Sequence, residues 1–369
     1  MHRKLTIVQV LPNLISGGVE KGVLEVAKYI SLKGHESIVI SGGGRMVDEL
    51  ECDGSKHIKW DIGRKSPITF FYIIKLIRLI KNKKIDIIHA RSRLPAWIVF
   101  LALKFINRNK RPHFITTVHG FNSISFYSSI MTKGERVFVV SKSVQKFITK
   151  NYKFNKLNIV LNYRGVDSKE FNLNSLLNKK WLKSWEKEFP YLNNKIILSF
   201  PSRITSRKGH EDFIYLISKL KQDNINIHGL IIGDPKLSSN KYLHSLENQV
   251  IDSNLKENIT FTGYRSDVKN IIAYSDIVYS LSREPESFGR TVIESIKLKT
   301  PFIGYDHGGV GEQLSMVFPE GQVELNNKEA LYEKTKKILK EKPEISDTNL
   351  FALDDMLSKT LKTYQEISS

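Results

Sequence analysis

The chain of 369 residues has a single cysteine, Cys52, which excludes an intramolecular disulfide and any metal site built from several cysteines. One unreactive thiol is compatible with a reducing compartment. Long apolar runs are also missing, because residues 68–74 and 96–103 both end at a lysine, well short of the ~20 residues a membrane span needs. Residues 1–11 lack the pattern of a secretory signal, so we expect a cytoplasmic protein.

Motifs of several common enzyme classes are absent as well. The chain has no HExxH or CxxC pair, no Asp-x-Asp at a strand end, no P-loop, no G-x-S-x-G and no G-x-G-x-x-G. We therefore expect no bound metal ion and no dinucleotide cofactor. If the protein is an enzyme, its chemistry has to come from other residues.

Acidic residues are scarce: 57 lysines and arginines stand against 38 aspartates and glutamates, for a formal net charge of +19. Between Arg64 and Arg111 there are thirteen basic residues and one acid, Asp86. Such an excess indicates nucleic acid, an anionic membrane surface or an acidic substrate as partner. No nucleic-acid motif or stripe of basic and aromatic residues supports the first. Heavy use of Lys, Ile and Asn is also typical of an AT-rich genome.

The chain is long enough for two cores, and strands and helices alternate along it in two series. The first series starts with a strand at 6–11, a glycine turn, a helix to Ile30 and a strand at 37–41. Further strands are expected at 85–90, 114–119, 136–141, 158–162, then at 196–200, 227–233, 259–263 and 276–281. This order predicts two doubly wound parallel sheets. We place the first domain at 1–166, a linker at 167–194, the second domain at 195–345 and a final segment at 346–369.

Residues 276–314 carry the most specific pattern in the chain. Two glutamates, Glu286 and Glu294, stand eight positions apart, and Ser287-Phe288-Gly289 follows the first. Glu286 lies on the loop after the strand at 276–281, and Glu294 lies on the first turns of the next helix. Ligands of open α/β sheets bind at this end of the strands, and a helix start presents free N–H groups to an anion.

This E-x7-E segment, with Gly308-Gly309 and Glu312 some twenty residues later, resembles the donor-binding segment of retaining GT-B glycosyltransferases of family four (glycosyl transferases group 1). An isolated glutamate on a helix is usually a solvated surface residue, so the resemblance depends on the whole segment. It implies two Rossmann-like domains facing across a cleft that holds the active site, with the last helix returning to the first domain. It also implies that Glu286 and the groups of Ser287, Phe288, Gly289 and Arg290 hold the donor sugar, while Glu294 holds the ribose. The amino-acid sequence of residues 283–295 further resembles that of bacterial members of the family that build the lipopolysaccharide core.

Arg203 and Lys208 lie on the loop after the first strand of the second domain. Two cations on one loop suit a diphosphate, because Arg offers a forked donor and Lys a compact charge. The alternative is a solvated basic loop. The segment resembles the family's G-R-x4-K-G loop, whose cations neutralise the leaving diphosphate, although Ser202 replaces the usual glycine. The adjacent Arg207 could be confused with Lys208.

Gly17 and Gly18 lie between the first strand and the first helix. Glycine lets a backbone N–H approach a phosphate closely, although such turns use glycine for other reasons too. The turn is similar to the family's G-G-x-E turn, which faces the donor diphosphate.

His119 ends a strand of the first domain, where a histidine is more often structural than catalytic, but it matches a family histidine that contacts the donor sugar. His89 ends the preceding strand, and we expect it to face the same ligand; Arg91 and Arg93 are candidate acceptor contacts. In the second domain the resemblance places Gly263, Tyr264 and Arg265 beside the nucleotide base.

These patterns predict a hexosyltransferase-type enzyme that moves a sugar from a nucleotide-diphosphate sugar to an acceptor hydroxyl with retention. The acceptor is expected to be a glycan or glycolipid, lipid-linked or of lipopolysaccharide type, reached by a peripheral enzyme on the anionic inner face of the cytoplasmic membrane. The alternatives are a GT-B nucleotide-sugar epimerase and, less favoured, a basic nucleic-acid-binding protein.

Overall fold

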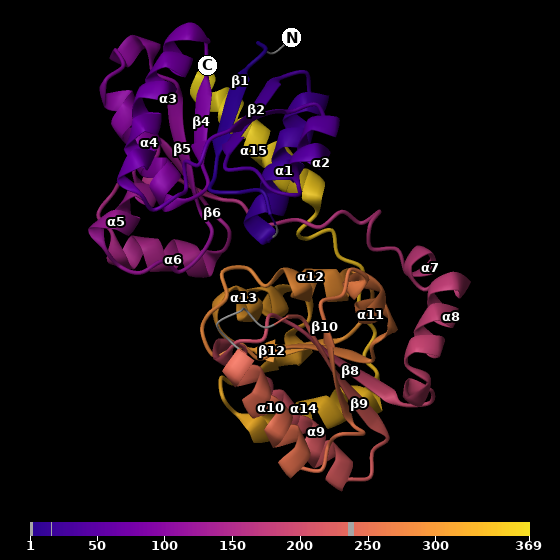
Figure 1. The fold of residues 1–369 in the computed structure, drawn as a ribbon. Helices are drawn as coiled ribbons and strands as arrows, with labels where there is room; N and C mark the ends of the chain where they lie inside the picture. Colours follow the sequence, from indigo (N-terminus) through magenta and orange to yellow (C-terminus); the bar gives the residue numbers. More distant parts are fainter. Residues whose placement is uncertain (1–2, 16, 235–239) are drawn as a thin grey trace. The chain divides into compact units, whose positions relative to one another are not determined.

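A computed structural model describes residues 3–15, 17–234 and 240–369. The chain forms two compact units, each built on a parallel sheet (Figure 1). The first unit comprises Met1–Gly165 together with Leu353–Ser369, and the second comprises Val166–Ala352. The first unit is therefore made from two segments that are far apart in the sequence.

The sheet of the first unit has seven strands in the order β3-β2-β1-β4-β5-β6-β7, all parallel. The strands are β1 Thr6–Val10, β2 Glu36–Ser41, β3 Lys56–Lys59, β4 Ile87–Ala90, β5 His113–Val118, β6 Arg136–Val139 and β7 Ile159–Leu161. The strand order changes direction between β1 and β4, which pair directly. At such a switch point the two following connections leave in opposite directions, which opens a crevice at the carboxyl ends of the strands.

The helices of this unit are α1 Gly18–Leu32, α2 Val47–Cys52, α3 Phe71–Asn82, α4 Arg93–Lys104, α5 Phe126–Ser129, α6 Lys142–Asn151 and α15 Leu353–Ser368. The last of them supplies Met356, Leu357, Leu361 and Tyr364 to a core cluster that also contains Ile7. The Tyr364 side chain is fully buried there. The carboxyl-terminal helix thus completes the core of the first unit.

The second unit has a six-stranded parallel sheet in the order β10-β9-β8-β11-β12-β13. Its strands are β8 Ile196–Pro201, β9 Ile227–Ile232, β10 Ile259–Gly263, β11 Ile277–Ser280, β12 Phe302–Tyr305 and β13 Gln322–Val323. Its helices are α7 Leu173–Leu176, α8 Lys179–Glu188, α9 His210–Gln222, α10 Asn240–Asp252, α11 Val268–Tyr274, α12 Arg290–Lys297, α13 Gly308–Val317 and α14 Lys328–Glu341. Here the switch point lies between β8 and β11.

Residues 167–194, which we expected to be a linker, pack as part of the second unit. Helix α8 stacks Trp181 on Trp185, with ring centroids 5.1 Å apart, and Trp185 contacts Phe189 at 4.5 Å. These rings join Ile197 and Leu230 in one hydrophobic cluster. Aromatic side chains bury so much surface that this segment is held against the sheet.

Candidate active site

The carboxyl edge of the second unit's sheet collects most of the residues that the sequence singled out. Strands β8 and β11 are neighbours at the switch point, and β12 lies next to β11. The loop after β8 carries Arg203 and Lys208, the loop after β11 carries Glu286, and α13 begins just after β12. Side chains far apart in the sequence are thereby brought to one place.

Lys208 and Glu286 are joined directly across this edge. The Nζ atom of Lys208 lies 2.7 Å from Oε1 of Glu286, which also accepts a hydrogen bond of 3.2 Å from the Ser280 hydroxyl. Arg207, in contrast, pairs with Glu284 in a largely exposed contact. The structure therefore distinguishes the two adjacent cations: Lys208 pairs with Glu286, the first glutamate of the motif, and Arg207 pairs with Glu284.

Arg203 differs from Lys208 in having no fixed partner. Its side chain is exposed, and among the residues described by the structure none forms a hydrogen bond or ion pair with it. An arginine held on a short loop without a counter-ion can offer its forked donors to an incoming anion.

Two glycines allow the start of α13 to pack against the loop after β11. The N–H of Gly309 donates to the carbonyl oxygen of Glu286 at 2.6 Å. A Cβ atom on Gly309 would lie 2.6 Å from the Cα of Phe288, and Gly308 has a φ of +60°. The side-chain amide of Gln313 donates to the carbonyl oxygen of Phe288. The backbone of both loops is thus in direct contact.

Helix α12 begins immediately after this contact, with Gly289 as its N-cap in the left-handed conformation at a φ of 76°. Arg290 is the first helical residue, and its Nε atom donates to Oε1 of Glu294 at 3.0 Å. Both side chains are about four-fifths buried. Among the described residues no side chain caps this helix, so its amino end presents a positive dipole that favours an anion.

The end of β10 and the loop after it carry Gly263, Tyr264 and Arg265, which the family resemblance places beside the nucleotide base. Gly263 has a φ of +66° and the Tyr264 ring is exposed. The Arg265 guanidinium forms ion pairs with Asp267 at 2.8 Å and Glu188 at 2.5 Å, and these bonds raise its pKa. Arg265 therefore fastens helix α8 to this loop, while Tyr264 is the residue left open to solvent.

In the first unit, Gly17 and Gly18 form the turn between β1 and α1. Gly17 has a φ of +130°, and a Cβ atom there would lie 2.7 Å from Oε2 of Glu20. Burial raises the pKa of the Glu20 carboxyl. A Cβ atom on Gly18 would meet no heavy atom within 4 Å. The turn itself needs glycine at position 17, whereas position 18 has room for a side chain.

His119 follows β5 at the carboxyl edge of the first unit's sheet. Arg164 donates to its Nδ1 atom at 2.7 Å, so the ring proton lies on Nε2. Burial and the nearby charges of Arg164 and Arg91 lower the pKa of His119 well below its usual value. Its Nε2 atom is buried and has no hydrogen-bond partner among the described residues. The neutral imidazole thus holds an unused donor.

His89 does not face a ligand site, contrary to our expectation. Its side chain is fully buried; Nδ1 lies 2.5 Å from the Tyr364 hydroxyl, and Nε2 lies 2.6 Å from the Thr117 hydroxyl. Arg91 is also buried and bonds Thr117 and Gln9. Strand β4 lies in the middle of the sheet, so these side chains contribute to the interior of the unit.

Comparison with known proteins agrees with this arrangement. A family model described as glycosyl transferases group 1 matches residues 183–350, and one described as Glycosyltransferase Family 4 matches residues 16–170. The crystal structure of a glycosyltransferase from Rickettsia africae ESF-5 is 34% identical and has a TM-score of 0.86, with 99% of each chain covered. The chain belongs to the family 4 glycosyltransferases.

Two more distant proteins are also similar to this glycosyltransferase chain, one in structure and one in sequence. Anabaena HepE in complex with UDP-glucose has a TM-score of 0.81 at 15% identity, covering 98% of this chain and all of that chain, which shows the shared GT-B fold. A UDP-Gal:α-D-GlcNAc-diphosphoundecaprenol α-1,3-galactosyltransferase from Escherichia coli is 25% identical, covering 69% of this chain and 66% of its own length. The epimerase alternative finds no support in these comparisons.

Three residues that bond the candidate residues were not singled out in the sequence analysis. Ser280 and Gln313 bond the motif loop, and Arg164 orients His119. Gln313 directly follows Glu312 in the glycine-rich segment, and Arg164 lies near the end of the predicted first domain. Their polar character was visible, but their partners come from distant strands.

Replacing Gly18 with alanine tests whether a ligand uses the space beside it. Because the free structure has room for the new methyl group, we expect the melting temperature to stay within about 1 °C of wild type. If a donor phosphate approaches this N–H closely, KM for the donor rises about tenfold, a loss of ~1.4 kcal/mol. Steady-state kinetics measure KM, and an unchanged KM would contradict the phosphate role of Gly18.

Proposed function

We propose that this glycosyltransferase moves a sugar from a uridine-diphosphate sugar to an acceptor hydroxyl, with retention at the anomeric carbon. The observation that carries the proposal is the ion pair between Lys208 and Glu286 at the switch point of the second sheet, on the same connection as Arg203, which has no partner among the described residues. UDP is favoured as the nucleotide because HepE binds UDP-glucose and the galactosyltransferase from E. coli uses UDP-Gal.

The main chemical demand of this reaction is stabilisation of charge on the leaving diphosphate. Arg203 and Lys208 would supply cationic donors, and the uncapped start of α12 would supply backbone N–H groups. Glu286 would orient the sugar hydroxyls. Glu294 would accept hydrogen bonds from the ribose hydroxyls. We assign the sugar contact of the first unit to Nε2 of His119, a buried donor without a partner in the described structure.

Retention in this proposal does not use a carboxylate nucleophile. Glu286 is already bound by Lys208 and by Ser280, and such bonds favour a carboxylate that positions a substrate. A front-face displacement, in which the acceptor hydroxyl attacks on the side of the departing diphosphate, agrees with the family resemblance. Analysis of the anomeric configuration of the product by NMR tests this assignment, and an inverted product would refute it.

Thermal stabilisation by nucleotides tests the donor assignment. A ligand that binds only the folded protein raises its melting temperature. We expect UDP to raise it more than ADP or GDP, and Glu294→Ala to reduce that rise by at least half, because the ribose contact is lost. Glu284→Ala changes an exposed glutamate of the loop that precedes α12 and serves as the matched control.

Two outcomes of that experiment would count against the proposal. If UDP shifts Glu294→Ala as strongly as wild type, Glu294 does not hold the ribose. If no nucleoside diphosphate shifts the wild type, the donor proposal fails as a whole.

We further propose a lipid-linked glycan as acceptor, bound by an enzyme at an anionic membrane surface. The E. coli galactosyltransferase acts on a diphosphoundecaprenol-linked sugar. The first unit also exposes a set of apolar side chains around α3 and α5, which we call the apolar face: Ile68, Phe70, Phe71, Ile74, Phe126 and Tyr127. A cavity of about 250 Å³ between Phe70, Trp97 and Phe126 has walls made only of apolar atoms.

Basic side chains accompany the apolar face. Lys75 lies over the rings of Phe71 and Tyr72, and Arg93 lies over the ring of Tyr127. Apolar groups beside lysine and arginine are what an anionic bilayer surface attracts. In the residues that the structure describes, every helix is too short or too polar to span a bilayer.

Sedimentation with vesicles checks the role of the apolar face. We expect salt-sensitive binding of the wild type to phosphatidylglycerol vesicles, and at least a tenfold weaker binding after Phe70→Ser with Phe126→Ser, since an inserted aromatic ring contributes about 1.5–3 kcal/mol. Leu157→Ser is the control, because Leu157 is 88% exposed but lies outside this face. Equal binding by both variants would contradict the proposal.

A further inference from the structure

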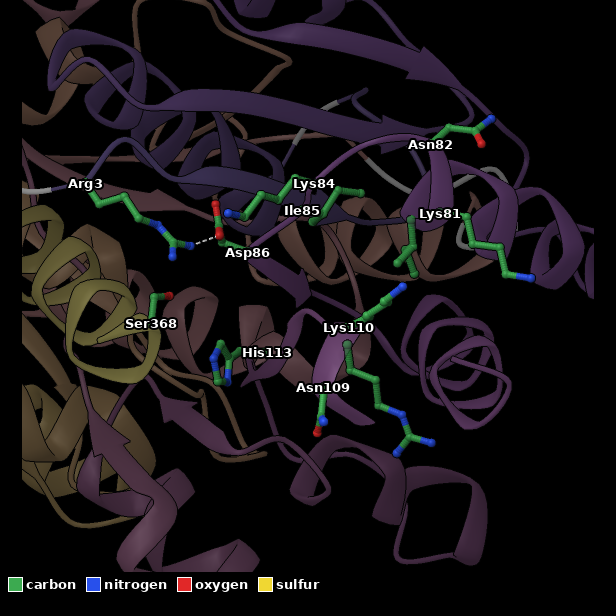
Figure 2. A pocket seen from close by; sticks show the side chains of 12 residues that line it. Arg3, Lys81, Asn82, Lys84, Ile85, Asp86, Asn109, Lys110, His113 and Ser368 are labelled. Carbon is green, nitrogen blue, oxygen red and sulfur yellow. Dashed lines mark hydrogen bonds and ion pairs between the residues drawn. The ribbon is translucent and has the colours of Figure 1, made fainter. Parts of the chain in front are cut away.

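A basic cavity lies at the amino edge of the first unit's sheet, the edge opposite His119 and the glycine turn. Its volume is about 460 Å³, and it lies among the residues that precede β1, β4 and β5 and the ends of α3 and α15. Figure 2 shows Arg3, Lys84, Asp86, Lys110, His113 and Ser368 around it. Strands β4 and β5 are four and six residues long, which separates the two edges by about 13–20 Å at ~3.3 Å per residue.

Cations dominate the lining of this cavity. Its lining includes one acidic residue, Asp86, and five basic residues: Arg3, Lys81, Lys84, Lys110 and Arg111. Both oxygens of the Asp86 carboxylate are already occupied, one by the Arg3 guanidinium and the other by the N–H of Thr6 at 2.7 Å. Asp86 therefore neutralises Arg3, and in the described part of the chain no carboxylate pairs with the other cations of the lining.

The lysines of the cavity contrast with their neighbour Lys83. Lys83 points to Glu36, with Nζ 2.5 Å from its carboxylate, and this bond lowers the pKa of Glu36. Across residues 3–15, 17–234 and 240–369, the side-chain ammonium groups of Lys84 and Lys110 form no ion pair or hydrogen bond. His113 is paired with Glu135 at 2.9 Å, so that glutamate is also engaged.

Lysines at this edge of an α/β sheet commonly balance the negative carboxyl ends of helices, but that role does not account for all of the lysines here. The carboxyl ends of α3 and α15 reach the cavity, and each carries roughly half a negative charge from the helix dipole. Two such ends would balance about one lysine. The Arg111 guanidinium also donates to the carbonyl oxygens of Ile106 at 2.7 Å and Lys104 at 3.4 Å. With Lys81, Lys84 and Lys110, the cavity still keeps an excess of positive charge.

We propose that this cavity binds a phosphate group, at a site separate from the one that handles the donor. Phosphate suits it because three lysines and Arg111 line the cavity, and because Asn82, Asn109 and the Ser368 hydroxyl offer further hydrogen bonds. The volume accommodates a single phosphorylated group and excludes a nucleic-acid duplex. The phosphate comes either from a free phosphate compound or from a phospholipid headgroup, since the chemistry of recognition is the same.

Calorimetric titration with pyrophosphate tests the site in the full chain. Arg203→Ala with Lys208→Ala is used as the common background, so that binding in the second unit does not contribute. We expect Lys84→Ala with Lys110→Ala to weaken pyrophosphate binding at least tenfold, and added salt to weaken the binding to the unaltered cavity. Lys153→Ala with Lys156→Ala removes two exposed lysines elsewhere in the same unit and is the matched control.

A second arm identifies the source of the phosphate. The same variants are sedimented with phosphatidylcholine vesicles that contain or lack phosphatidic acid. Lysine-dependent binding to phosphatidic acid without binding of pyrophosphate assigns the site to a headgroup, and the reverse result assigns it to a free phosphate compound. The proposal is overturned if the unaltered cavity binds neither, or if the cavity variant binds both as well as the control does.

Discussion

Lys208→Ala is expected to lower kcat by about 10²–10³-fold, the loss typical of removing one group that stabilises charge in a transition state. The Nζ atom of Lys208 bonds Glu286, so the substitution removes a cation from the proposed diphosphate site and frees the glutamate as well. KM for the donor should change less than kcat, because the charge on the leaving group develops in the transition state. Initial rates over a range of donor concentrations separate the two constants.

Arg207→Ala is the control for that substitution. Arg207 is the adjacent cation, but its exposed pair with Glu284 lies away from Glu286, so its loss should change kcat less than about twofold. If Arg207→Ala is as damaging as Lys208→Ala, the loop would act through its overall charge, and the specific assignment of Lys208 would be wrong.

Gly309→Ala should damage the proposed donor site through the backbone. The new methyl group would lie 2.6 Å from the Cα of Phe288 and 2.7 Å from its nitrogen, and neither atom can move aside alone. Such overpacking costs about 1–3 kcal/mol, and it displaces the loop that leads into α12. We expect kcat/KM to fall by about 10²-fold or more, since a misplacement of 1 Å at a reacting centre has this effect.

The readout for Gly309→Ala combines thermal unfolding with steady-state kinetics. Ser315→Ala changes an exposed residue of the same helix, α13, and should leave both measurements close to wild type. A Gly309→Ala protein that keeps its donor KM and kcat would show that contact between the two loops is not needed for activity.

The sequence predicted the two parallel sheets and the edge where the motif residues meet, because strand patterns and strand ends are local properties. It predicted the proximity of Lys208 and Glu286 only through the family resemblance. Partners supplied by distant segments could not be predicted: Arg265 pairs with Glu188 of α8, and His89 bonds Tyr364 of the last helix. The stacked Trp181 and Trp185 made a core helix from a stretch whose polarity had indicated a linker.

The edge strand β3 and the short helix α2 were also missed. β3 has only four residues and is exposed at both ends, so it shows neither a buried run nor a clear alternation. Its place is fixed by pairing with β2, between Ile38–Ser41 and Lys56–Lys59.

The division of the first unit into two segments has a consequence for synthesis on the ribosome. The core around Ile7 is closed by Tyr364 and its neighbours, which are made only after the whole second unit. At about 5–20 residues per second, translation of the intervening second unit takes roughly ten to forty seconds. During that time the second unit has all of its own sequence and can fold, whereas the amino-terminal segment keeps an open apolar surface. Chaperone protection of the nascent chain therefore matters more for the first unit than for the second.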